Sequence, residues 1–262
     1  MPSSSTTTAQ PKLQAAETPD RIQLALESIV RIQQATDPPQ LLDRMMHATT
    51  LIGASASIYS ISIPEDGTEP STFSLFASHP VLAQDNSSRG ALAHHPWLRC
   101  ARSRSTPATQ RQVETESPAD IEAIDLARQY GFRSCLIVPV RSTADPERVE
   151  MLCLGSIDDE AFEGEGARLV RMLARAMAAE LHDWVGQHLK ESLRLAASLR
   201  KPDIELLKFE FQGLGTKEIA QRTGMTLASV DSRFQRINAR LACTNRKASA
   251  RRAAAYGLLE AG

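Results

Sequence analysis

Apolar positions recur along the first part of the chain at helical spacing and then at the spacing of strands. Helical spacing begins at Arg21 and again near Asp37. Apolar and polar residues alternate strictly over Ala56–Ile63, stop at a Pro-Glu-Asp-Gly turn, and alternate again over Thr72–Phe76. This part of the chain therefore predicts two helices followed by a β-hairpin.

Residues 87–112 are irregular and basic, and regular spacing returns after them. The expected elements are a helix over 120–130 closed by Gly131, apolar strands over 134–140 and 149–157, and a long helix over about 166–188. Helices that flank an antiparallel sheet predict an α+β fold, here an α-β-α sandwich typical of a sensor domain.

A set of shorter helices follows Leu199. A helix over 202–211 is expected to turn Ile204, Leu207 and Phe211 inward, and a short helix over 217–222 ends at Gly224. Thr226 then caps a further helix, expected over 226–242. Two short helices around a tight turn that contains glycine are the helix-turn-helix pattern.

The helix after Thr226 separates apolar from basic residues. Its apolar stripe is Val230, Phe234, Ile237 and Leu241, and a face about 120° away carries Ser229, Ser232, Arg233, Arg236 and Arg240. Arg can bond guanine edges in the major groove, and Ser can bond bases or phosphates. The N-termini capped by Thr216 and Thr226 would present backbone N–H groups to phosphates. A solvated basic face without function is the alternative.

Composition fits a folded protein with two domains, and charge separates the two. The 262 residues are 42% hydrophobic and 23% charged, which is typical of globular proteins. The net charge of −1 divides into +6 from Leu199 onward and −7 before it. A basic module on an acidic body suggests nucleic-acid contact. The expected organisation is a disordered tail over 1–20, a sensor domain over 21–188, a linker over 189–198 and an all-α helix-turn-helix domain over 199–262.

No constellation of catalytic residues is visible, so we expect no enzyme, no metal site and no cofactor. His79, His94 and His95 lack ligand spacing. The four cysteines fit reduced thiols in a core, although Arg133 beside Cys135 leaves redox sensing open. No apolar run is long enough to cross a bilayer and the first residues form no leader, so a cytoplasmic protein is expected.

The C-terminal residues resemble the LuxR-type helix-turn-helix over some 64 residues. The matching residues are Asp203, Leu207, Gly213, Thr216 to Ala220, Ser229-Val230, Arg240-Leu241, Asn245-Arg246 and Tyr256 to Leu259. The resemblance implies a four-helix module whose fourth helix, about 246–256, contacts a second copy. A dimer would bind a palindromic operator in double-stranded DNA. Arg233 and Arg236 are then candidates for base contact, and Lys217, Arg240, Arg246 and Lys247 for phosphate contact. Leu214 stands where the family carries a Lys.

The segment Ala127–Val140 resembles the acyl-homoserine-lactone-binding domain of the quorum-sensing members of that family. Residues of the family's lactone site differ here, at Ala83, about Ser87, His95, Gln110 and Cys135. An unpaired buried polar group costs about 1 to 3 kcal/mol, so lactone binding in the usual pose is expected to be lost. The candidate ligand residues are Tyr59, His95, Trp97, Gln110 and Cys135.

These patterns predict a dimeric, DNA-binding transcription regulator of quorum-sensing type, with RNA polymerase as a further candidate partner. One alternative is an antiactivator that sequesters a quorum-sensing receptor by heterodimerisation. A sensor of host metabolites is another, compatible with the first. The sequence names neither ligand, operator nor regulated genes, nor whether binding activates or represses.

Overall fold

The computed structural model describes residues 19–65, 70–77, 94–141 and 147–259. Most of the expected N-terminal tail lies outside these residues. So do His79, Ala83 and Ser87. The larger elements are α1 (Pro19–Val30), α2 (Pro38–Ile52), β1 (Ala56–Ile63), β2 (Ser71–Ala77), α4 (Pro96–Ser103), α5 (Pro118–Gln129), β4 (Ser134–Val140), β5 (Val149–Ser156), α6 (Ala167–Ala196), α7 (Lys201–Phe211), α8 (Thr216–Thr223), α9 (Leu227–Arg240) and α10 (Arg246–Ala255). Short pieces are η2 (Arg31–Gln34), β3 (Ala108–Thr109) and η3 (Gln110–Gln112).

The chain divides into two compact units. The first comprises Met1–Tyr59, Leu75–Pro139 and Met151–Glu180, and the second comprises Ser60–Ser74, Val140–Glu150 and Leu181–Gly262. This division cuts through the sheet, so the predicted domain boundaries remain predictions.

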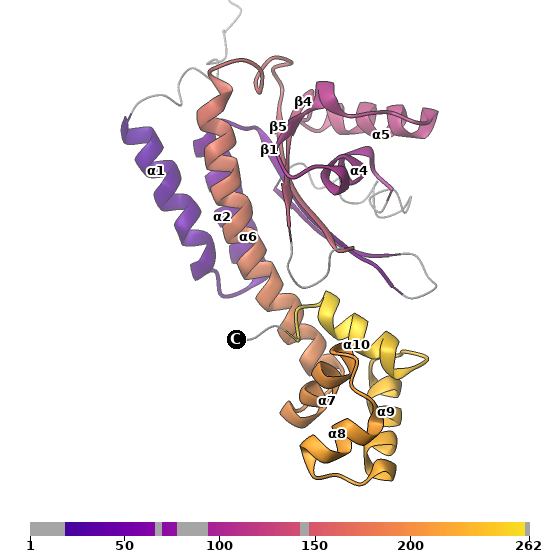
Figure 1. Cartoon of the computed structure of the whole chain (residues 1–262). Coiled ribbons are helices and arrows are strands. Elements are labelled where there is room, and N and C mark those ends of the chain that lie inside the picture. The colour runs from indigo at the N-terminus through magenta and orange to yellow at the C-terminus, as the bar shows by residue number, and fades with distance from the viewer. Residues whose placement is uncertain (1–18, 66–69, 78–93, 142–146, 260–262) are drawn as a thin grey trace, which may run out of the picture. The chain divides into compact units, whose positions relative to one another are not determined.

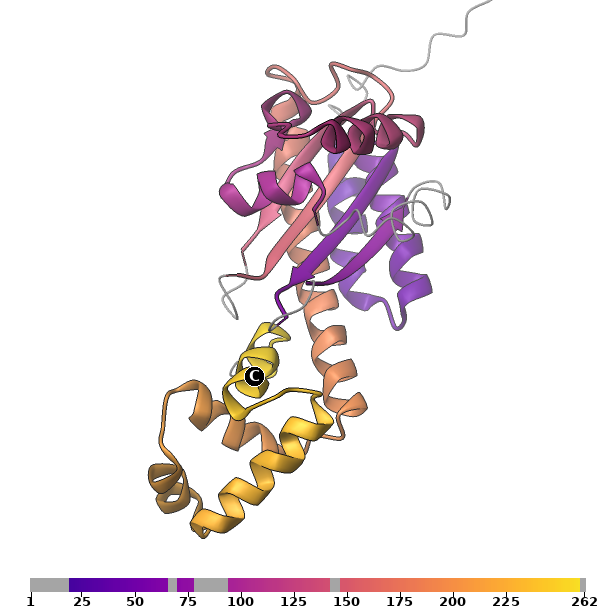
Figure 2. The same cartoon turned by 90° about the vertical axis from the view of Figure 1, so that its right-hand side faces the viewer.

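A five-stranded sheet is the centre of the α+β fold. Its strand order is β2-β1-β5-β4-β3, and β3 pairs antiparallel with β4 with Ala108 opposite Ile137. Helices α1 and α2 and the start of α6 lie on one side of the sheet, and α4 and α5 lie on the other (Figures 1 and 2). The expected α+β architecture with helices flanking a sheet is confirmed.

The central strands are buried along their whole length, because helices cover both faces of the sheet. Every residue of β1 and β5 is buried. Ser57, one of the polar positions in the alternating pattern of β1, is therefore buried as well, and its hydroxyl lies 2.6 Å from that of Thr49 in α2. The hydrogen bond offsets the cost of removing both hydroxyls from water.

Close packing under α5 requires a glycine in β5. A Cβ atom on Gly155 would lie 2.4 Å from Phe132 Cδ1 and 2.7 Å from the Gly131 carbonyl oxygen. No side chain fits there without displacing the ring, so Gly155 permits Phe132 to enter the core.

Two elements differ from the sequence expectation. Residues 96–103, expected to be irregular, form α4, which begins at Pro96 with His95 as its N-cap. The helix has only eight residues, too few for a clear period. The stretch predicted as a linker is helical as far as Ala196, because α6 extends for 30 residues.

Four helices pack around a separate core in the second unit. Leu207, Ile219, Val230, Phe234, Ile237 and Leu241 are among its buried residues. The turn between α8 and α9 depends on Gly224, whose φ of 69° is left-handed. Phe211, expected to point inward, is 52% exposed, and Leu206 is buried in its helix instead.

Candidate functional site

Helix α9 begins with a hydrogen-bonded cap. The Thr226 hydroxyl accepts a hydrogen bond from the Ser229 backbone N–H at 3.1 Å and lies 2.8 Å from the Ser229 hydroxyl. The predicted Thr226 cap is therefore present. Thr216, expected to cap α8, is instead its first residue, and the N-cap is Gly215, whose N–H donates to Glu218 at 2.7 Å.

One acidic residue of α7, Asp203, holds two arginines of α9. Arg233 Nε lies 2.8 Å from Asp203 Oδ1, and Arg240 Nη1 lies 3.6 Å from Asp203 Oδ2. Burial alone would raise the pKa of Asp203, but hydrogen bonds from the Arg200 backbone and the Arg233 side chain outweigh it and lower the pKa. Asp203 is therefore an ionised anchor, and Arg233 is held along the flank of α9.

Arg246, at the start of α10, is held in a similar way. Its Nε lies 3.0 Å from Glu210 Oε2, and its Nη1 donates to the Thr216 hydroxyl at 2.7 Å. Its guanidinium also lies 5.9 Å from the centre of the Phe234 ring. These contacts give Arg246 a structural role in joining α7, α8, α9 and α10.

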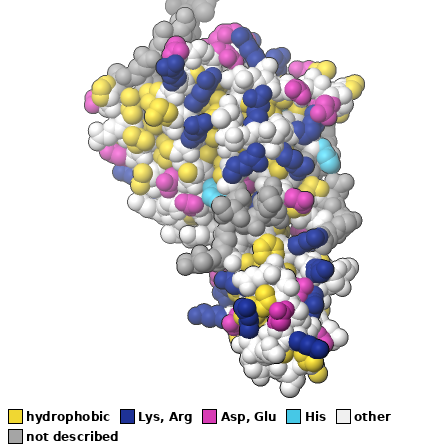
Figure 3. All heavy atoms as spheres, in the orientation of Figure 1, with side chains coloured by type: hydrophobic (Ala, Val, Ile, Leu, Met, Phe, Trp, Pro, Cys, Tyr) yellow, Lys and Arg dark blue, Asp and Glu magenta, His cyan; other side chains and the backbone are white. Residues whose placement is uncertain are grey.

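The other candidate DNA-binding side chains are exposed. They are Lys217, Thr226, Ser229, Ser232, Arg236, Arg240 and Lys247, whereas Thr216, Arg233 and Arg246 are half-buried. Figure 3 shows Lys and Arg side chains spread over the surface of the C-terminal helices, with Asp and Glu side chains between them. The sequence prediction missed Gln235, which is also exposed on α9; it could have been found by projecting the whole helix rather than its charged residues.

Four of the five candidate ligand residues meet in the first unit. Trp97 Nε1 donates to Gln110 Oε1 at 2.9 Å, and Cys135 Sγ donates to the same oxygen at 3.1 Å. The rings of His95 and Trp97 have centroids 4.4 Å apart, and the Trp97 ring lies 5.4 Å from that of Phe132. We call His95, Trp97, Gln110, Phe132 and Cys135 the Trp97 cluster. Its polar side chains are hydrogen-bonded within the protein.

His95 is neutral within the Trp97 cluster. Its Nδ1 accepts a hydrogen bond from the Trp97 backbone N–H at 3.3 Å. Burial lowers the pKa of His95 to about 4, although Asp120 and a hydrogen bond with the Ala123 backbone oppose the change. A neutral imidazole that caps α4 has a structural role, and its acceptor nitrogen is already occupied.

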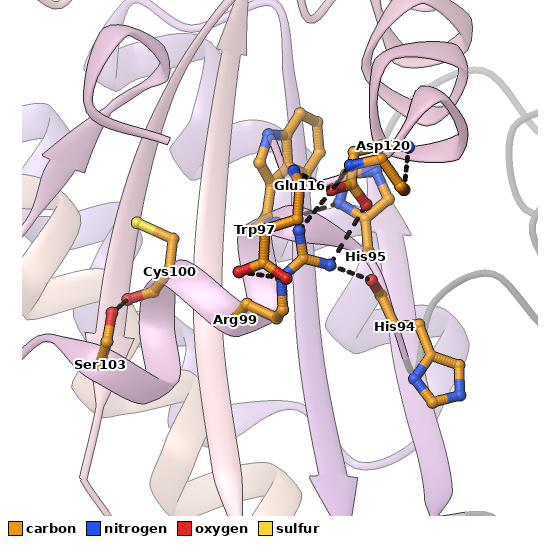
Figure 4. Close-up of polar contacts among 9 residues, drawn as sticks. His94, His95, Trp97, Arg99, Cys100, Ser103, Glu116 and Asp120 are labelled. Atoms are coloured by element: carbon orange, nitrogen blue, oxygen red, sulfur yellow. Dashed lines mark hydrogen bonds and ion pairs between the residues drawn. The ribbon is translucent and has the colours of Figure 1, made fainter. Parts of the chain in front are cut away.

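An ion pair ties α4 to α5 beside this cluster. Arg99 donates to both carboxylate oxygens of Asp120, at 2.6 and 3.2 Å, and its Nε lies 3.7 Å from Glu116 (Figure 4). Asp120 also accepts from the Glu116 and Ser117 backbone N–H groups at 2.7 and 3.2 Å. The hydrogen bonds from Arg99, followed by that from Glu116, lower the pKa of Asp120 to about 2.

The fifth candidate, Tyr59, is not part of this arrangement. Residues two apart in a strand share a face, so Tyr59 lies on the same face of β1 as Ser57, which bonds Thr49 of α2. Its side chain is fully buried. Tyr59 is expected beside the other four from the sequence, because alternation separates the two faces of β1 but does not tell which face lies toward α4.

A cavity of about 370 Å³ opens beside the Trp97 cluster. It is lined by Arg111, Arg128, Arg133, Ser134, Asp159, Phe162 and Glu163, together with Gln110 and Cys135. Arg133 and Asp159 form an ion pair at 2.8 Å, with both side chains more than half exposed. The cavity is thus polar and charged, and a purely apolar ligand would leave these groups poorly solvated.

The remaining chemistry of the described residues is limited. Cys100, Cys135 and Cys153 are buried free thiols, and burial raises the pKa of each. This environment disfavours the thiolate that redox sensing at Cys135 would need. Within the described ranges, no group of three or more His, Cys, Asp or Glu side chains could hold a metal ion. Nor does any helix in that part of the chain combine the length and apolarity needed to cross a membrane.

Comparison with known proteins shows the family to which the chain belongs. The model of the autoinducer binding domain matches residues 37–185, so the chain belongs to the family of proteins that carry this domain. The family is described by its domain, which binds autoinducers. No curated protein matches the chain.

Solved structures of LuxR-type receptors share the fold. SdiA in complex with octanoyl-rac-glycerol has a TM-score of 0.67 at 13% identity, covering 94% of this chain and 99% of that one. Escherichia coli SdiA in the space group P6522 has a TM-score of 0.65 at 14% identity, covering 91% of this chain and 99% of that one. CepR2 from Burkholderia cenocepacia, a LuxR-family transcription factor dependent on N-acylhomoserine lactone, has a TM-score of 0.55 at 13% identity, covering 65% and 98%. At these identities the similarity concerns the fold.

Proposed function

We propose that this protein is a sequence-specific DNA-binding transcription regulator of quorum-sensing type, and that it acts as a dimer. The observation that carries the proposal is α9: a helix capped by Thr226, packed on α8 across the Gly224 turn, with Ser232 and Arg236 exposed. Such a helix suits the major groove, which admits one α-helix and presents hydrogen-bonding base edges.

The ion pairs of α9 refine the roles expected for its arginines. Asp203 holds Arg233, which is therefore less available for base contact than the sequence suggested. Arg236 has no hydrogen bond or ion pair among the described residues and is exposed, so it is the primary candidate for base contact. Lys217, Arg240 and Lys247 are candidates for phosphate contact, and Arg246 contributes chiefly to the core.

Exposed apolar side chains support the proposal of a dimer. Leu24 and Val30 of α1 are 52% and 58% exposed, and Met172 of α6 is 69% exposed. Figure 3 shows apolar side chains gathered on the helical side of the first unit. A second copy could cover such a surface, and a two-fold dimer would place two α9 helices on a palindromic operator.

We propose further that the ligand domain does not bind a lactone in the usual pose. The indole N–H of Trp97 is bonded to Gln110, and the acceptor nitrogen of His95 is bonded to the backbone. A lactone entering here would have to replace these bonds, each worth about 1 kcal/mol. The neighbouring charged cavity favours a polar ligand.

The test is selection of binding sites by the purified full-length chain from randomised duplexes. An enriched palindrome is expected, and Arg236→Ala should weaken binding to it about tenfold or more. Arg102→Ala, which removes an exposed arginine of α4, is the matched control and should bind normally. Affinity should also fall steeply from 50 to 200 mM salt. Failure to enrich any sequence, combined with binding only to a quorum-sensing receptor, would favour the antiactivator alternative.

A further inference from the structure

The outermost side of α9 carries two long polar side chains among small ones. At 100° per residue, the buried stripe Val230, Phe234, Ile237 and Leu241 defines the inner side of the helix. The residues within about 50° of the opposite direction are Ala228, Ser232, Gln235, Arg236 and Ala239. All five are exposed. We call them the outer stripe.

The outer stripe is shaped for close approach to a surface. Three of its five side chains, Ala228, Ser232 and Ala239, are small and lie along the middle, so the helix backbone can come near a groove floor there. Gln235 and Arg236 are the two long side chains, one at each edge of the stripe. The Gln235 amide has two donors and an acceptor, and no hydrogen bond of that amide occurs among the described residues.

Arg233 and Arg240, which lie outside the outer stripe, are held away from its outward side. Arg233 and Arg240 both lie against Asp203, and Arg240 Nη1 also donates to the Ser198 carbonyl at 3.3 Å. Their guanidiniums are therefore directed along the flank of α9. A flank beside a helix in the groove faces the phosphates, whereas the outer stripe faces the base edges.

We infer that Gln235 specifies an adenine in each operator half-site, donating to adenine N7 and accepting from the N6 amino group. This bidentate pairing is the geometry in which Gln distinguishes adenine from the other bases. The inference rests on the proposed function, because it requires α9 to lie in the major groove. It assigns base recognition to a residue that carries no charge.

The experiment compares binding-site selection by the wild-type full-length chain with selection by Gln235→Ala and Gln235→Glu. Wild type should enrich a palindrome with adenine at one fixed position in each half. Gln235→Ala should lose about tenfold or more of its preference at that position and keep the others. Gln235→Glu should change the preference there to cytosine, whose N4 amino group a carboxylate accepts. Gln212→Ala, an exposed glutamine at the end of α7, is the matched control and should select the wild-type site.

Two results would overturn the inference in distinguishable ways. If wild type enriches a palindrome and both Gln235 variants enrich the same bases at every position, the proposed function stands and Gln235 is not a base reader. If wild type enriches nothing, the proposed function fails and the inference fails with it. Far-ultraviolet circular dichroism of both variants should match wild type, because Gln235 is exposed.

Discussion

Replacing Asp120 by Asn should destabilise the sensor fold by about 2 kcal/mol at pH 7. The carboxylate is almost fully buried and accepts hydrogen bonds from Arg99 and from two backbone N–H groups. These bonds lower its pKa from 3.8 to about 2, and that difference corresponds to about 2 kcal/mol of stability. Asn keeps one acceptor oxygen but loses the charge, and Arg99 remains partly solvated because its side chain is 35% exposed.

The lowered pKa of Asp120 also determines how the stability of the fold depends on pH. Because the pKa of Asp120 is lower in the folded chain, its contribution is complete above about pH 4 and is lost as the pH falls through about 2. The difference between wild type and Asp120→Asn should therefore shrink over that range.

Urea unfolding followed by Trp97 fluorescence, in a Trp184→Phe background, reports on α4 and its surroundings. Asp125→Asn, which changes an exposed aspartate of the same helix, is the control and should cost less than about 0.5 kcal/mol. If Asp120→Asn were as stable as that control at pH 7, the reasoning on this ion pair would be wrong.

Three further results are expected. Gly155→Ala should cost about 3 kcal/mol in urea unfolding, since its Cβ would lie 2.4 Å from Phe132, and a loss below about 1 kcal/mol would contradict the packing. Gln110→Leu should cost about 1 to 3 kcal/mol and shift the emission of Trp97, whose N–H loses its acceptor; an unchanged spectrum would show that the bond does not persist in solution. In the native protein a thiol reagent at pH 8 should modify Cys243 first, because it alone of the four thiols is not buried, and peptide mass spectrometry would reveal any other order.

The fold followed closely from the sequence where elements were long and periodic. Strand β4 has the predicted bounds, and Thr226 caps α9 as expected. Helix α4 was missed because eight residues give no clear period, and its cap is a buried His. The apolar spacing of α6 predicts a helix only to about His188, although the helix continues to Ala196.

The site was harder to predict because the roles of its residues depend on contacts that are distant in sequence. Arg233 resembles a free basic residue in the helix pattern, but its partner Asp203 lies 30 residues away. Tyr59 was grouped with Trp97, but alternation in β1 places it on the opposite face of the sheet. The Trp97–Gln110 bond joins a helix to a 3-10 turn, and no local pattern marks such a pair.

The most direct test of the account is the affinity of the full-length chain for its selected palindrome, compared with a scrambled duplex of equal length and composition, by fluorescence anisotropy at 150 mM salt. The account predicts binding to the palindrome at least about a thousandfold tighter, in the range of specific regulators. Affinities for the two duplexes within about threefold of each other would contradict the claim that α9 reads a DNA sequence.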